Sequence, residues 1–188
     1  MQMGNAVLTN RMIRAAKLES GLYEEVEHDQ SATTQALTVV IVAALASGIG
    51  GGLALLTLGI GGPGFFVLGL VRGIISALVS WVIWSAVVYY VGTNLFGGKA
   101  TLGEVLRTMG FAQTPQILNI LLFVPGLNVL IGLVAFVWVL VAVVIAIRQS
   151  LDVETNKAII TGVIAFVCVA VVSAILGRIG LGLSVLGG

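Results

Sequence analysis

A cluster of polar side chains interrupts the third apolar run of this sequence. Gln113, Pro115, Gln116 and Asn119 lie within seven residues of one another. Proline removes a backbone N–H and tends to kink a membrane helix, and neighbouring polar groups can satisfy the freed carbonyl. Because Gln116 and Asn119 are three residues apart, they can face one neighbouring helix and hydrogen-bond to it. The same side chains could instead line a polar path for a substrate, as broken helices do in transporters.

The residue types that catalysis and metal binding require are scarce. The chain has one histidine, His28, and one cysteine, Cys168. A haem held by two histidines, a multi-cysteine metal cluster and an intrachain disulfide are therefore excluded. No apolar run carries an ionisable group near its middle, which proton relays and ion-coupled carriers usually need. We expect no enzymatic activity, no catalytic residue, and no bound metal or cofactor.

A short polar stretch leads into the third apolar run and has the pattern of a helix start. Its two glycines favour the end of the preceding helix, because glycine adopts the left-handed conformation without a Cβ clash. Its threonine and glutamate match a capping box, and the arginine three residues beyond the glutamate can share its helix face. The residues of this motif are Gly97, Gly98, Lys99, Thr101, Glu104 and Arg107.

The composition indicates a membrane protein. Hydrophobic residues make up 59% of the chain and charged residues only 9%, whereas a soluble domain carries roughly 25% charged residues. So few charges cannot cover a surface that faces water, so lipid must cover part of it. The formal net charge of +1 gives no electrostatic reason to expect nucleic acid as a partner.

The apolar residues gather in runs that approach the length of a membrane span. A spanning helix needs about 20 mainly apolar residues, and glycine- and proline-rich turns separate the runs. We therefore expect an all-α polytopic membrane bundle with about five transmembrane helices. The runs are residues 36–58, 69–96, 108–124, 130–147 and 158–176.

Small residues recur at four-residue spacing on two of these runs. Gly48 and Gly52 share a face of the first, and Gly69 and Gly73 share a face of the second. Such faces let helix backbones approach closely in a membrane. We expect these glycines to be helix-packing positions.

The first 33 residues form a separate amphipathic arm in this interpretation, and residues 34–188 form the membrane domain. Leu8, Met12 and Ala16 follow helical spacing among basic residues. The arm could therefore lie on an anionic membrane surface, or it could be a short solvated helix packed on the bundle. A second short helix would bury an apolar face and expose three glutamates. The apolar residues are Leu22, Tyr23 and Val26, and the glutamates are Glu24, Glu25 and Glu27.

The charged residues give the expected orientation. With five spans and a cytoplasmic N-terminus, seven of the nine basic residues fall on the cytoplasmic side, and Arg72 and Arg178 fall on the other. Positive residues favour cytoplasmic loops. We therefore expect the N-terminus in the cytoplasm and the C-terminus on the opposite side.

The order of these features resembles one family of membrane proteins. An amphipathic arm, five spans, the GGKAT-L-G-E-x-L-R motif at Gly97–Arg107, a turn at Pro125 and a charged link at 148–152 occur in that order. This is similar to the Yip-domain family of small multi-pass membrane proteins, in its prokaryotic branch. Eukaryotic relatives are implicated in membrane trafficking and bind prenylated Rab-type GTPases. For this chain the resemblance implies the membrane topology, in a prokaryotic cytoplasmic membrane.

Two hypotheses for function follow. The first is a non-enzymatic membrane protein that binds partners as a scaffold, a membrane-organising protein or an accessory subunit of a larger complex. Its partners would be the lipid bilayer and other membrane proteins or further copies of itself, through the arm and residues 149–156. The second is a small carrier or channel that uses the polar third helix. A water-filled cavity at Gln113, Gln116 and Asn119 would favour the second, and a closed core there would favour the first.

Overall fold

The computed structural model describes residues 2–178, with the side chains of residues 6–171. Helices make up 84% of the described residues, which contain no strand. The end of the expected 34–188 domain lies outside the described residues. The helices are α1 (Gln2–Ala16), α2 (Ser20–His28), α3 (Ala32–Thr57), α4 (Pro63–Phe96), α5 (Leu102–Phe111), the 3₁₀ helix η1 (Thr114–Phe123), α6 (Asn128–Ser150) and α7 (Thr155–Arg178).

Three of these helices are long and apolar enough to cross a membrane. They are α3, α4 and α6, and the apolar part of α7 that is described, Thr155–Val171, is shorter. These helices agree with a polytopic membrane bundle, and their outward side chains are mostly leucine, isoleucine, valine and phenylalanine. The molecule is therefore an integral membrane protein.

The third expected span is broken into two helices. The sequence predicts one kinked helix at 108–124, but α5 begins six residues earlier at Leu102 and ends at Phe111, and η1 follows. Ten residues of α-helix and ten of 3₁₀ helix give roughly 15 and 20 Å of length. Laid end to end, these lengths are comparable to the roughly 30 Å of the hydrocarbon core.

Pro115 explains the position of the break. It stands in the first turn of η1, and its missing N–H would otherwise bond to the carbonyl of Phe111 in an α-helix. The hydroxyl of Thr114 donates to that carbonyl over 2.7 Å. The prediction that a nearby polar group satisfies the freed carbonyl is therefore confirmed.

The two arm helices share the core of the bundle. Leu22, Tyr23 and Val26 of α2 are fully buried, in the same cluster as Phe111 of α5 and Ile147 of α6. The sequence predicts this apolar face of α2 correctly. Hydrophobic packing thus joins the arm to the membrane helices, in contrast to an arm that stands apart from them.

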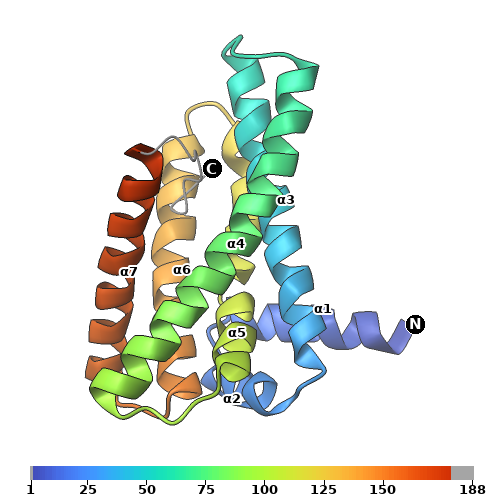
Figure 1. Cartoon of the computed structure of the whole chain (residues 1–188). Coiled ribbons are helices and arrows are strands. Elements are labelled where there is room, and N and C mark those ends of the chain that lie inside the picture. The colour runs from blue at the N-terminus through green and yellow to red at the C-terminus, as the bar shows by residue number, and fades with distance from the viewer. Residues whose placement is uncertain (1, 179–188) are drawn as a thin grey trace.

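Figure 1 shows how the helices are arranged. α1 lies across the bundle, and α2, the α4–α5 connection and the α6–α7 link gather at one end, which we call the arm end. The α3–α4 hairpin extends beyond the other helices at the opposite end. The arm end therefore brings together three segments that are far apart in the sequence.

Candidate functional site

The glycines at the end of α4 permit a close contact with the α6–α7 link. Gly97 has φ of 70°, the left-handed conformation expected of a helix C-cap. A Cβ on Gly98 would lie 3.0 Å from both the Cβ and the carbonyl oxygen of Leu151. The backbone N–H of Lys99 donates to that same carbonyl over 3.0 Å. Leu151 and Gly92, whose added Cβ would overlap the Leu151 side chain, are members of this contact that the sequence analysis did not identify.

The capping box at the start of α5 is present as the sequence predicts. The Thr101 hydroxyl oxygen accepts from the Glu104 N–H over 3.3 Å, and Glu104 Oε2 accepts from the Thr101 N–H over 2.7 Å. Two N–H groups that the helix leaves unpaired are thereby satisfied. The box fixes the direction in which α5 leaves the arm end.

Arg107 binds the arm, and among the described side chains it makes no ion pair with Glu104. The helix face that Arg107 and Glu104 are predicted to share therefore does not bring them into an ion pair. Arg107 is 7% exposed, and its Nε donates to the carbonyl of Val26 over 2.9 Å. Its Nε and Nη2 also donate to the carbonyl of Glu27. These carbonyls belong to the last turn of α2, where the helix itself supplies no donor.

A second buried arginine joins α1 to α2 and α3. Arg11 donates to Glu25 and Gln35 over 2.9 Å each and to Asp29 over 2.8 Å. Arg14 extends this network with an ion pair to the same Glu25 at 2.5 Å. Hydrogen bonding from Arg14 lowers the pKa of Glu25, and bonds from Ser31 and then Arg11 lower the pKa of Asp29.

The arginine network helps to decide whether the arm lies on an anionic membrane surface or packs on the bundle. The arm has three basic residues, and two of them, Arg11 and Arg14, pair with acidic residues of the same chain. Charges that are paired in this way have less capacity to attract anionic lipid. The indole N–H of Trp138 on α6 donates to the carbonyl of Ala16, the last residue of α1, over 2.8 Å. These contacts favour the reading in which the arm packs on the bundle.

Glu27 is buried, although the sequence predicts that it is exposed. It is 5% exposed, and its Oε2 has no hydrogen-bond partner among the described residues. Burial raises the pKa of this carboxyl to about 7. The prediction is wrong because α2 packs against α5 and α6 on more of its circumference than one apolar stripe would cover.

The polar residues of the broken span make one bond between helices. Asn119 Nδ2 donates to the Ser47 hydroxyl oxygen of α3 over 3.1 Å, whereas Gln116 Nε2 donates within its own segment to Gln113 Oε1 over 2.5 Å. Gln116 and Asn119 therefore do not both bond to one neighbour. The Asn119 backbone carbonyl lies where a Cβ on Gly50 would be, so η1 approaches α3 as closely as a glycine permits.

The four glycines singled out on α3 and α4 fall into two pairs. A Cβ on Gly48 would lie 2.7 Å from Leu70, and one on Gly52 would lie 2.6 Å from Phe66. Gly69 and Gly73 face space into which a Cβ would fit. Close approach of α3 and α4 thus depends on the pair on α3. Beside it lies an apolar groove of about 390 Å³, lined by Gly48, Gly52 and Gly69 among others.

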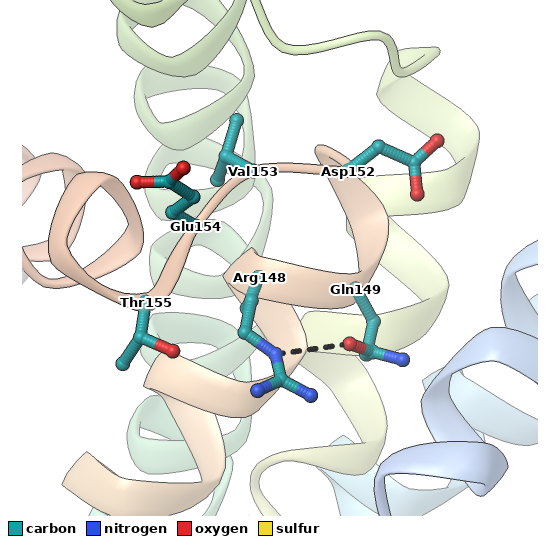
Figure 2. Close-up of a pocket in the computed structure, with 6 residues that line it drawn as sticks. All are labelled: Arg148, Gln149, Asp152, Val153, Glu154 and Thr155. Atoms are coloured by element: carbon teal, nitrogen blue, oxygen red, sulfur yellow. Dashed lines mark hydrogen bonds between the residues drawn. The ribbon is translucent and has the colours of Figure 1, made fainter.

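A recess of about 460 Å³ lies at the α6–α7 link, at the arm end. Figure 2 shows Arg148 and Gln149 on the last turn of α6, joined by a hydrogen bond of 3.1 Å, with Glu154 and Thr155 at the start of α7. Asp152 points in a different direction from Arg148. The recess is lined mostly by polar side chains and carries charges of both signs. Such a lining suits contact with a polar protein surface more than binding of a small apolar ligand.

Comparison with known proteins places the chain in a family. No curated protein and no solved structure matches it. The family model described as the Yip1 domain matches residues 22–176. The matched range begins in α2 and contains the α4–α5 connection, the broken span and the α6–α7 link. Because it covers most of the chain, the protein belongs to the Yip1 domain family.

Proposed function

We propose that this protein is a non-enzymatic membrane scaffold or accessory subunit that binds other proteins at its arm end. One observation carries the proposal: the arm is fastened to the membrane helices. Arg107 and Trp138 each hold the last turn of one arm helix, and Arg11 joins α1 to α2 and α3. A surface assembled from three segments and fixed by buried bonds is preorganised for a partner.

The proposed binding surface consists of the α6–α7 link and the outer side of α2. Glu24 and Glu154 are exposed there, as are Asp152 and Lys157. Their polar and mixed charge agrees with the rim of a protein interface. We propose that this end faces the cytoplasm, because most of the basic residues lie there, and that the membrane is a prokaryotic cytoplasmic membrane, as the resemblance implies.

The alternative, a small carrier or channel, has less support. Neither the groove between α3 and α4 nor the recess at the link is lined by Gln113, Gln116 or Asn119. Gln116 and Asn119 instead donate to oxygens of the chain. Polar groups bonded to one another in this way favour the packing role over a path for solute.

A photo-crosslinking side chain placed at Glu154 tests the proposal in native membranes. We expect adducts with one discrete protein, because the link would lie at the interface. The matched control places the same group at Leu133, a lipid-facing residue of α6 that is 58% exposed, where only lipid adducts are expected. Lipid adducts alone at both positions, or the same proteins at both, would contradict binding at the arm end.

A further inference from the structure

Glu27 stands where three segments of the arm end meet. It lies in the last turn of α2, which packs against α5 and α6. Its carboxyl oxygen Oε2 is buried and unpartnered among the described residues. An ionised carboxylate in such a place lacks both water and a counter-charge, and that is costly unless the group takes up a proton.

The charged groups around Glu27 offer it little compensation. His28 on α2 is the one nearby group that favours its charge, whereas Asp152 of the link, Glu104 of α5 and Glu24 of α2 oppose it. Arg107 of α5 directs its hydrogen bonds to the backbone carbonyls of Val26 and Glu27 and not to the carboxylate. Burial is the largest cause of the raised pKa, and the three acidic neighbours add to it.

We propose that Glu27 makes α2 a proton-controlled latch, which is closed on α5 and α6 when the carboxyl is neutral and loosens when it ionises. Loosening uncovers the apolar face of Leu22, Tyr23 and Val26, which the closed latch buries completely. The latch is a property of this chain alone, so it stands or falls independently of any partner.

The direction of the pH effect follows from the two states. A released α2 would carry Glu27 with its ordinary pKa of 4.5, and the docked state holds it at about 7. The docked state therefore binds the proton more tightly. Docking is favoured below pH 4.5, weakens as the pH rises between these values, and stays weak above about 7.

Hydrogen exchange of the α2 amides, on the whole protein in lipid nanodiscs, tests the latch. Rates from pH 5 to pH 8.5 are corrected for the intrinsic chemical exchange rate. In the wild-type protein we expect protection of residues 20–28 to fall reversibly as the pH rises, by at most about 75-fold over this range, the limit set by the two pKa values. Glu27→Gln, which cannot ionise, should stay protected across the range.

Two further variants test whether the pH effect comes from Glu27. Glu24→Gln removes an exposed carboxylate from the same helix and should keep nearly the wild-type pH profile. Asp152→Asn removes a negative neighbour of Glu27 and so lowers the pKa of Glu27 in the docked state. The loss of protection should therefore be smaller than in the wild type and should end at a lower pH, and asparagine tolerates the positive φ of 53° at that position. A flat wild-type profile, a Glu27→Gln profile that follows the wild type, or a larger loss of protection in Asp152→Asn than in the wild type would overturn the proposal.

Discussion

Arg107 and Trp138 each donate a side-chain N–H to the last turn of a short helix. The final carbonyls of a helix have no partner within it, so each donor completes a helix that would otherwise end unpaired. Both donors come from helices of the bundle and both acceptors from the arm. Two side chains thereby connect the arm to the bundle through backbone atoms.

We expect Arg107→Met to destabilise the protein by about 2 kcal/mol, because the buried carbonyls of Val26 and Glu27 lose a charged donor. Thermal unfolding in detergent measures this, together with hydrogen exchange of α2, which should become the fastest-exchanging helix of the core. The matched control is Lys99→Met, since that side chain is exposed on the same connection and should change stability by less than about 0.5 kcal/mol. Equal effects of the two substitutions would contradict the role of Arg107.

The hydrogen bonds of the capping box can be predicted from the local sequence, whereas the partners of Arg107 cannot. Thr101 and Glu104 are three residues apart, so their spacing alone predicts their bonds. The acceptors of Arg107 lie 80 and 81 residues away in the sequence, and no local pattern indicates them. The burial of Glu27 is of the same kind, because it depends on the packing of α2 against α5 and α6.

At the scale of elements, the contact between α4 and the α6–α7 link decides where the arm end closes. Leu151 is fully buried against Gly92 and Gly98, and its carbonyl accepts from Lys99. Gly92 and Gly98 therefore make room for Leu151, which lies more than fifty residues later in the sequence.

A double-mutant cycle tests this contact. Gly92→Ala should destabilise the protein by about 1–3 kcal/mol, because its Cβ would overlap the Leu151 side chain. Leu151→Ala alone should destabilise it by about 2–5 kcal/mol through a cavity. In the double variant the alanine methyl enters that cavity, so the two effects should fall short of their sum by at least about 1 kcal/mol. Strict additivity in chemical or thermal unfolding would show that the two residues do not contact each other.

The broken third span shows what apolar periodicity can and cannot predict. Pro115 and its polar neighbours indicate a kink, and the structure has a break between two helices there. The sequence does not indicate that the second half is a ten-residue 3₁₀ helix, because such runs are uncommon and depend on packing. Here Gly50 lets the η1 backbone approach α3, and that contact between distant segments fixes the shape of the span.

At the scale of the whole molecule, the arm is an integral layer of a membrane bundle, and its charges set the pH range in which it is most stable. The pKa values of Glu25 and Asp29 are lowered by partners that include Arg14 and Arg11. Their contribution is present above the ordinary values of 4.5 and 3.8 and is lost as the pH falls through the lowered values. Glu27 acts in the opposite direction above pH 4.5.

We therefore expect docking of the arm to be most stable near pH 5 and to weaken on both sides. On the acid side, hydrogen exchange of α1 should accelerate as the pH is lowered from 5 to 3. Arg14→Gln should reduce this acid effect, because Arg14 is the largest cause of the lowered Glu25 pKa. Lys17→Gln, a substitution of an exposed basic residue of the arm, serves as the control. Arm stability that rises continuously down to pH 3 would contradict the arginine network.

If this Yip1 domain protein acts through a protein bound at its arm end, that partner should be recovered with it. We would purify the protein from native membranes in a mild detergent, identify what accompanies it by quantitative mass spectrometry, and measure the mass of the complex. We expect one partner at a fixed stoichiometric ratio, and a reduced yield of that partner when Glu154 is changed to Lys. Recovery of this chain alone, as a monomer or as copies of itself, would overturn the proposed partner binding and would direct attention to solute flux across the membrane.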